Sequence, residues 1–230
     1  MGILIAIEGT DSSGKQTQSE RLYESLINQG IKARLVSFPA YESNSSALVK
    51  MYLAGEFGTD PKDVNAYAAS TFYAVDRYAT YRKDWGKDYE DGTVIIADRY
   101  VPSNLIHQAS KIDNEREKTE FIKWLDELEY DKLSLPRPDA TVFLDMPTEM
   151  AQKLMAERAN KIDNSEKKDI HERNGEYLKK SYNNAKGIAE RLLWNVVPCT
   201  DTDGNVRSIN DISNEILNIV RGVIDDKKTI

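Results

Sequence analysis

Short apolar runs alternate with longer amphipathic stretches along the whole chain. Runs of five or six mostly apolar residues that end at polar or turn-forming positions are typical of buried strands in a parallel sheet. The predicted strands are Ile3–Ile7, Ala33–Phe38, Thr93–Ala97, Thr141–Asp145 and Trp194–Cys199. Between them, apolar residues recur at the three- and four-residue spacing of a helix. The predicted helices open at or near Lys15, Ala47, Pro61, Pro102, Glu115, Thr148, Glu172 and Ile209.

This alternation predicts an α/β fold, with a five-stranded parallel sheet flanked by helices on both faces. The length of 230 residues suits a single domain with a small appended lid. Apolar periodicity nearly vanishes at residues 158–171, which read RANKIDNSEKKDIH. We interpret this segment as a candidate mobile lid, and a solvated surface linker is the alternative because charged runs are usually solvated.

Composition excludes several classes of protein. The net charge is −7 and no block of lysines and arginines stands out, which argues against polymeric nucleic acid as a partner but not against nucleotides. No apolar run approaches the length of a membrane span, so no membrane association is expected. The chain enters a strand directly, which disfavours a signal peptide. A single cysteine, Cys199, suits a reducing compartment. The expected location is cytoplasmic.

The first strand leads into the pattern G-x-x-x-x-G-K at Gly9–Lys15, which is typical of a phosphate-binding P-loop. Glycines let several backbone N–H groups point at one anion, and the following helix adds the positive end of its dipole. A lysine at the end of the loop supplies charge for the β- and γ-phosphates of a nucleotide. An ordinary Gly/Ser turn is the alternative. The predicted ATP-binding residues are Gly9, Thr10, Asp11, Ser12, Ser13, Gly14, Lys15, Gln16 and Thr17.

Gln16 departs from the P-loop pattern, which has Ser or Thr there as a magnesium ligand. Three readings remain open: the Gln16 amide oxygen binds magnesium, a water fills the gap, or Thr17 substitutes after a local shift. The third requires a side chain displaced by about 100° around the helix. Asp98 follows the third predicted strand directly, so its carboxylate should emerge beside the P-loop at the carboxyl edge of the sheet.

Five motifs in order carry a resemblance to a known family. They are I-E-G-x-D-x-x-G-K at Ile7–Lys15, F-P at Phe38–Pro39, F-x-x-x-D-R at Phe72–Arg77, D-R-Y-x-x-S at Asp98–Ser103 and P-D-x-T-x-F-L-D at Pro138–Asp145. From about residue 3 to residue 219, the chain resembles the thymidylate kinases, which are P-loop nucleoside-monophosphate kinases. The resemblance implies a three-layer P-loop NTPase fold, ATP with Mg²⁺, phosphorylation of dTMP to dTDP in dTTP biosynthesis, and a homodimer.

The resemblance also implies roles for single residues. Asp11 is expected near the sugar and phosphate of the acceptor nucleotide, with a turn-stabilising role as its alternative. Phe72 is expected to stack on thymine, and Arg77 to line the same pocket; core packing and a surface ion pair are the respective alternatives. The remaining implied acceptor contacts are Phe38, Pro39, Asn104 and Gln108. His107 stands where family members often carry tyrosine, near the place of a ribose 2′-hydroxyl.

The implied catalytic groups surround the transferred phosphoryl. Asp98 resembles the acid that positions hydrated magnesium, and Arg99 is expected to clamp the acceptor phosphate, as a bidentate guanidinium can. A structural Asp–Arg pair is the alternative. The family supplies a further arginine from the P-loop or the lid, and this P-loop has none. The lid candidates are Arg158 and Lys161, followed by Lys167, Lys168 and Arg173.

Two rival functions remain open from the sequence. One is a kinase for another nucleoside monophosphate or for a nucleoside, which would need a base for the 5′-hydroxyl; Glu8, Asp11 and Asp98 are the acids near the pocket. The other is a nucleotide-binding protein without turnover, which the departures at Gln16 and His107 keep open.

Overall fold

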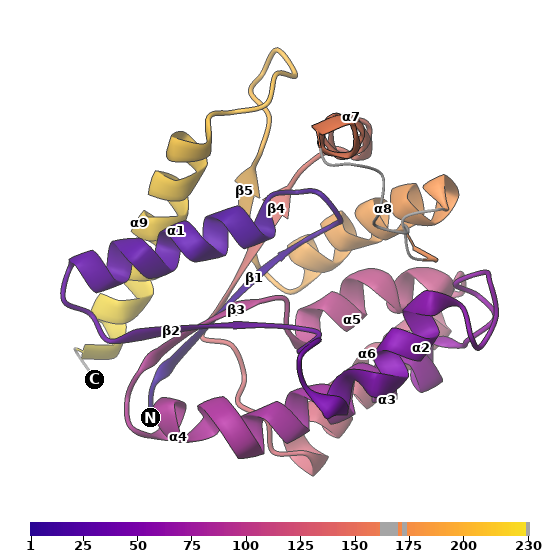
Figure 1. Cartoon of the computed structure of the whole chain (residues 1–230), viewed down its shortest axis with the longest axis horizontal. Coiled ribbons are helices and arrows are strands. Elements are labelled where there is room, and N and C mark those ends of the chain that lie inside the picture. The colour runs from indigo at the N-terminus through magenta and orange to yellow at the C-terminus, as the bar shows by residue number, and fades with distance from the viewer. Residues whose placement is uncertain (162–169, 172–173, 229–230) are drawn as a thin grey trace.

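The computed structural model describes residues 1–161, 170–171 and 174–228. Its centre is a parallel sheet in the order β2-β3-β1-β4-β5, as Figure 1 shows. The strands are β1 (Ile3–Gly9), β2 (Ala33–Ser37), β3 (Val94–Asp98), β4 (Ala140–Asp145) and β5 (Asn195–Pro198). This confirms the predicted five-stranded parallel sheet and places each strand within a residue or two of its expected bounds.

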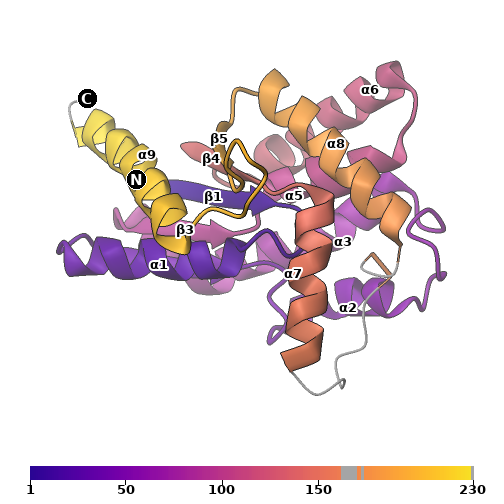
Figure 2. The same ribbon diagram turned by 90° about the horizontal axis from the view of Figure 1, so that it is seen from above.

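Side chains of β1 alternate between two hydrophobic layers. Ile3, Ile5 and Ile7 pack with residues of α1 and α9, whereas Leu4 and Ala6 pack with residues of α4, α5, α6 and α8. Because successive residues of a strand point to opposite faces, a strand between two helical layers must be apolar at every position. All seven residues of β1 are buried accordingly. Figure 2 shows α1 and α9 on one side of the sheet and α5 and α8 on the other.

Helices account for most of the remaining chain. They are α1 (Lys15–Asn28), α2 (Ala47–Ala54), α3 (Ala66–Thr80), α4 (Gly86–Glu90), α5 (Val101–His107), α6 (Glu115–Asp126), α7 (Thr148–Lys161), α8 (Gly175–Arg191) and α9 (Ile209–Lys228). Short 3₁₀ turns lie at Asn44–Ser46 and Ala109–Lys111, and π-helical turns continue α3 at Tyr81–Trp85 and α6 at Glu127–Lys132. None of these described helices is long and apolar enough to cross a membrane.

Two predicted helix starts are too early. The helix expected from Glu172 begins at Gly175, after its N-cap Asn174. The helix expected from Pro61 begins at Ala66, because the Asn65 side chain accepts a hydrogen bond from the Ala68 N–H at 2.9 Å and so caps the first turn. Asparagine is a favoured N-cap, and its signal competes with that of a proline a few residues earlier. The boundary matters because α3 carries one wall of the site described below.

The segment expected to form a lid lies largely outside the described residues. Arg158 and Lys161 belong to α7, and Lys167, Lys168 and Arg173 fall outside the description. The last two residues of the segment are described and packed: Ile170 and His171 are buried, and the Ile170 N–H donates to the Leu53 carbonyl at 3.3 Å.

Candidate active site

The P-loop occupies the turn between β1 and α1. Gly14 immediately precedes α1 with φ of +89°, a conformation that glycine adopts without strain. At Gly9, an added Cβ would lie 2.4 Å from the Ser13 hydroxyl oxygen, so a side chain there would force Ser13 to move. Both glycines of the motif therefore satisfy geometric demands of a loop whose N–H groups must converge.

Lys15 folds back over this loop. Its Nζ donates to the Thr10 carbonyl at 2.8 Å, and the residue is buried. Burial, followed by repulsion from Arg99, lowers the pKa of Lys15 to about 8, while nearby carboxylates oppose the shift. A polyphosphate in the loop would restore the charged form, because an anion favours the ammonium over the amine.

Several polar atoms at this edge of the sheet lack partners. Among the residues that the structure describes, the hydroxyl oxygens of Thr10 and Ser13 and the Oδ1 of Asp98 are buried without a hydrogen bond. Asp98 ends β3 and pairs in register with Ile7 of β1, two residues before the P-loop begins. The two hydroxyl groups can donate hydrogen bonds to phosphate oxygens, and the carboxylate oxygen can bind hydrated magnesium.

Gln16 points elsewhere in this structure. Its side chain is exposed, and its Nε2 donates to the Glu20 carboxylate at 3.0 Å, one turn along α1. The described chain holds no group of three or more His, Cys, Asp or Glu residues placed to bind a metal ion. Magnesium bound by one or two protein groups, waters and phosphates needs no such cluster.

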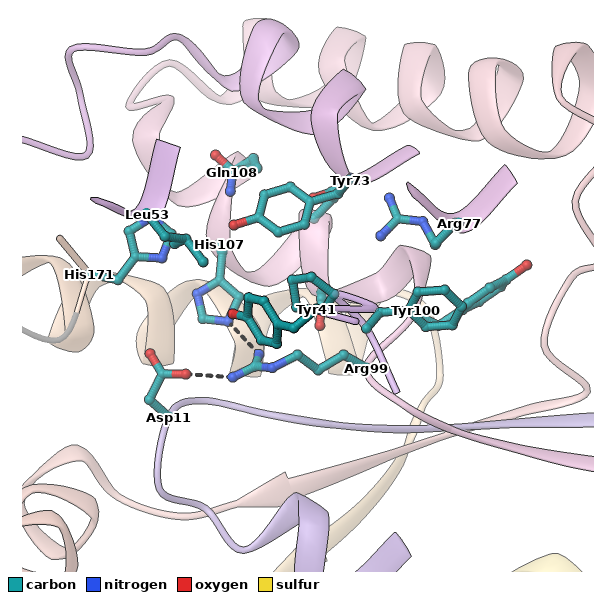
Figure 3. A pocket seen from close by; sticks show the side chains of 14 residues that line it. Asp11, Tyr41, Leu53, Tyr73, Arg77, Arg99, Tyr100, His107, Gln108 and His171 are labelled. Carbon is teal, nitrogen blue, oxygen red and sulfur yellow. Dashed lines mark hydrogen bonds and ion pairs between the residues drawn. The ribbon is translucent and has the colours of Figure 1, made fainter. Parts of the chain in front are cut away.

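A cavity of about 520 Å³ opens beside the P-loop (Figure 3). Its lining residues come from the P-loop, the loop after β2, helices α2, α3 and α5, and the described end of the lid segment. They are Asp11, Phe38, Pro39, Tyr41, Leu53, Tyr73, Arg77, Arg99, Tyr100, Ser103, Asn104, His107, Gln108 and His171. The cavity thus brings together every predicted acceptor-binding residue except Phe72.

Arg99 and Asp11 form the floor of the cavity. The Arg99 Nη2 donates to Asp11 Oδ1 at 2.5 Å, and its Nη1 contacts the His107 Nε2 at 3.1 Å (Figure 3). Burial alone would raise the pKa of Asp11, but the Arg99 guanidinium holds it well below its usual range. Arg99 has φ of +66°, a strained conformation for a non-glycine residue and one that concentrates at functional sites. Its guanidinium is held between the P-loop residue Asp11 and the cavity.

Comparison with known proteins assigns the family. The thymidylate kinase family profile matches residues 7–202. The chain belongs to the thymidylate kinase family. It is 33% identical over 177 residues to the thymidylate kinase of Mycobacterium tuberculosis H37Rv, a match covering 76% of this chain and 79% of that protein. It is 26% identical over 227 residues to the probable thymidylate kinase of Thermococcus gammatolerans, covering 97% and 95%.

A solved structure agrees on the fold. The thymidylate kinase of Candida albicans superposes with a TM-score of 0.67 at 21% identity, covering 96% of this chain and 92% of that one. The three-layer P-loop fold expected from the motifs is thus confirmed.

Tyr73 takes the place in the cavity that the sequence assigned to Phe72. The Phe72 ring packs against Tyr52 and Phe57, with ring centroids 6.3 and 5.6 Å apart, while Tyr73 lines the cavity (Figure 3). The signal was present in the sequence: Tyr73 precedes Arg77 by four residues and so shares its helix face, whereas Phe72 precedes it by five. Base stacking by Phe72 stays a prediction, and the cavity favours Tyr73 for that role.

Arg77 and Gln108 lie deep in the same cavity. The Arg77 guanidinium is buried and paired with the Glu129 carboxylate, rather than forming the surface pair considered as its alternative. The Gln108 side chain is buried, and within the described residues its Oε1 has no hydrogen-bond partner. A buried amide oxygen without a partner is a candidate contact for a polar ligand.

Two buried acids organise the walls without lining the cavity. Asp76 on α3 accepts hydrogen bonds from the Ala40 N–H at 2.8 Å and the Ser45 hydroxyl at 2.6 Å, and so ties the loop after β2 to α3. Glu8 on β1 accepts from the Tyr100 N–H and the Ser103 hydroxyl, and burial raises its pKa to about 7. Because both Glu8 oxygens are engaged, a supporting role fits this carboxyl better than that of a base.

Two histidines, His107 and His171, also line the cavity. Their rings stack with centroids 6.1 Å apart, and His171 also shares a 2.9 Å hydrogen bond with the Tyr52 hydroxyl. Arginine can only donate, so the His107 Nε2 that contacts Arg99 must accept, and the proton sits on Nδ1. Sequence reasoning missed His171, because nothing local to it indicates that it returns to α2.

These histidines should make the fold acid-sensitive. Burial lowers the pKa of His171 to about 4 and that of His107 well below its usual value. The unfolded chain therefore takes up protons below pH 6.5 that the native state refuses, and stability falls as the pH drops. We expect His171 to account for about 2 kcal/mol of unfolding free energy between pH 6.5 and 5. Urea denaturation of wild type and His171→Gln at both pH values tests this. An equal loss of unfolding free energy in the two proteins between pH 6.5 and 5 would contradict it.

Proposed function

We propose that this protein transfers the γ-phosphoryl group of Mg-ATP to the 5′-phosphate of dTMP, giving ADP and dTDP. The observation that carries the proposal is the contact between two phosphate-binding elements: the P-loop with Lys15, and the Arg99–Asp11 floor of the adjoining cavity. A donor polyphosphate in the loop and an acceptor phosphate at Arg99 would meet at one edge of the sheet. The family membership supports dTMP as the acceptor.

The chemistry needs positioning and charge neutralisation. An oxygen of the dTMP phosphate, already ionised near neutral pH, forms the new bond to the γ-phosphorus, and the bond from that phosphorus to the bridging oxygen of ADP breaks. No general base is required. Lys15 neutralises charge on the donor, and Arg99 holds the acceptor, so both reduce the repulsion between two anions brought into contact.

Magnesium is proposed to accompany ATP. Asp98, with its unpartnered Oδ1, would hold the ion through water, and the Thr10 and Ser13 hydroxyls lie in the same loop region. When bound, the ion supplies charge stabilisation to the β- and γ-phosphate oxygens. Gln16 remains a proposed ligand that would have to leave Glu20 to reach the ion. Arg158 of α7 remains the proposed lid cation.

The acceptor nucleoside is proposed to lie along α3 and α5. Arg77, Asn104 and Gln108 present polar groups for the base, and Phe38 and Pro39 supply apolar wall, with Tyr73 or Phe72 as the stacking ring. The cavity lies at the carboxyl edge of the parallel sheet, where α/β folds bind small ligands. The net charge of −7 disfavours polymeric nucleic acid as a ligand.

The first test is acceptor-dependent ADP release from Mg-ATP, with dTMP, dUMP, dCMP, dGMP and thymidine as separate acceptors. We expect turnover to be strongest with dTMP. A preference for another monophosphate, or for thymidine, would contradict the proposal and show that the protein is a kinase for that acceptor. If nothing is turned over, activity of Gln16→Thr would locate the defect at the metal site. If that variant is also inactive yet ATP and dTMP both raise the melting temperature, the protein is a non-catalytic nucleotide binder.

A cytoplasmic homodimer is proposed as the working form. Tyr67, Val75 and Tyr78 lie along one face of α3 and are 39%, 51% and 40% exposed, an apolar stripe on the outer side of the helix that carries the site. A second copy of the chain would cover this stripe. The composition and the absence of a membrane-spanning helix in the described chain are compatible with a location in the cytoplasm.

Disrupting the stripe should dissociate the dimer. We expect the wild-type chain of 26.1 kDa to sediment at about twice its mass and Val75→Glu to sediment as a monomer, because a buried unpaired carboxylate is costly at an apolar interface. Val196→Glu is the matched control, since Val196 is 43% exposed on β5, away from α3. A monomeric wild type, or a dimeric Val75→Glu variant, would contradict the stripe as the interface.

A further inference from the structure

Glu129 is a fully buried acid that no step of the proposed reaction uses. It lies on the π-helical turn after α6, more than 20 residues in sequence from either cavity residue that it contacts, and is 0% exposed. Its Oε2 accepts from the Arg77 Nε at 2.9 Å, and its Oε1 accepts from the Arg77 Nη2. The same Oε1 accepts from the Asn104 Nδ2 at 3.3 Å. One carboxylate thus holds two residues of the cavity wall from behind.

The contact fixes which way the Asn104 amide faces. Its Nδ2 donates to the Ser70 carbonyl at 3.4 Å as well as to Glu129, so both amide hydrogens are directed at acceptors. A carbonyl oxygen cannot replace the Nδ2 opposite a carboxylate, because two acceptors would then repel one another. The amide oxygen of Asn104 is therefore the group left for a ligand, and it is an acceptor.

Arg77 is fixed with the opposite polarity. Glu129 engages the edge formed by Nε and Nη2, which leaves the Nη1 hydrogens of Arg77 for the cavity that the residue lines. A guanidinium has no acceptor and stays protonated, so it can offer only donors. The wall near Arg77 and Asn104 then presents one donor and one acceptor in a fixed arrangement.

We propose that Glu129 is a positioning residue that sets the hydrogen-bonding polarity of this wall and thereby selects a 4-oxo pyrimidine over a 4-amino pyrimidine. Thymine and uracil carry a donor at N3–H and an acceptor at O4, which complement the Asn104 oxygen and the Arg77 donors. Cytosine carries an acceptor at N3, which would face the Asn104 oxygen. Its amino group at C4 is a donor, which would face the Arg77 donors. Leaving buried polar groups mismatched is how such sites reject analogues. The inference rests on the proposed function, because it concerns the acceptor of that reaction.

Gln108 does not provide the same discrimination. Within the described part of the chain its buried Oε1 has no partner, so nothing on the protein fixes that amide, and a rotation can present either a donor or an acceptor. The Asn104 amide differs from that of Gln108 because the Glu129 carboxylate fixes its orientation. Replacing Glu129 with glutamine supplies an amide in place of the carboxylate, and this lets the Asn104 amide turn over.

The test compares acceptor preference in Glu129→Gln and wild type at saturating Mg-ATP. We expect the ratio of kcat/KM for dTMP to that for dCMP to fall by about tenfold or more, with the dTMP to dUMP ratio and the KM for ATP unchanged. Thymine and uracil share the N3 and C4 groups, so a polarity effect leaves their ratio intact. A loosened fold would change all acceptors together.

Leu125→Val is the control, because Leu125 is buried one turn earlier on α6 and does not line the cavity. It should lower the melting temperature without changing the dTMP to dCMP ratio. An unchanged ratio in Glu129→Gln, or an equal change in the control, overturns the inference. If Glu129→Gln does not fold, Glu129→Asp keeps the charge at shorter reach, and a reduced ratio supports the inference while an unchanged one overturns it. Wild-type protein inactive with dTMP would instead refute the proposed function.

Discussion

Replacing Lys15 with methionine should reduce kcat by about 10²–10³-fold while leaving the fold intact, because a charge aimed at the transferring phosphoryl is worth that much in comparable sites. The stability of the variant should change by no more than about 1 kcal/mol, since methionine fills similar space and burial already disfavours the lysine charge. Steady-state turnover with Mg-ATP and dTMP, and urea denaturation of the same preparations, measure the two effects.

Lys111 provides a matched control for that experiment. It is a second lysine whose pKa burial lowers, to about 7, and it donates to the Tyr52 hydroxyl and the Val64 carbonyl rather than to the P-loop. Lys111→Met should lose far less turnover than Lys15→Met. Equal losses in the two variants would show that removal of any buried lysine charge disturbs the protein, and the phosphate role of Lys15 would then be unsupported.

Replacing Arg99 with lysine should lower kcat/KM for dTMP by about 10²-fold or more and leave the KM for ATP nearly unchanged. Lysine keeps the charge but cannot hold Asp11, His107 and an acceptor phosphate with one planar group. Arginine and lysine at position 99 would share the backbone strain at φ of +66°, so the comparison isolates the side chain. Initial rates with each substrate varied in turn measure the two constants.

Arg34→Lys is the control for Arg99→Lys. Arg34 also pairs with carboxylates, those of Asp84 and Asp88, but it lies near the start of β2, at the opposite end of the sheet from the site. Its substitution should leave both kinetic constants unchanged. A rise in the KM for ATP rather than for dTMP in Arg99→Lys would place Arg99 on the donor instead of the acceptor.

The sequence predicted best what depends on local pattern. A strand between two helical layers must be apolar at every position, and a tight loop needs glycine at set places, so β1 and the P-loop could be recognised from adjacent residues. Helix ends were less secure: the start of α3 at Ala66 depends on a side-chain cap at Asn65 that competed with the earlier proline signal.

Contacts between distant segments could not be read from the pattern. Glu129 looks like one more acid on a charged helix, and only the turn after α6 brings it against Arg77, 52 residues earlier. His171 likewise returns to Tyr52 across 119 residues. Tyr73 is a different case, because its spacing from Arg77 already distinguished it from Phe72. Long-range pairing of this kind follows from the topology of the fold rather than from any periodicity in the chain.

The tie that Asp76 makes between the loop after β2 and α3 has a thermodynamic consequence for binding. The hydrogen bonds to Ala40 and Ser45 order that loop, which carries Pro39 and Tyr41 into the cavity wall, before any nucleotide arrives. The conformational entropy of the loop is lost when the chain folds, so it need not be lost again when the acceptor enters. Part of the free energy of folding is thus converted into affinity for the acceptor.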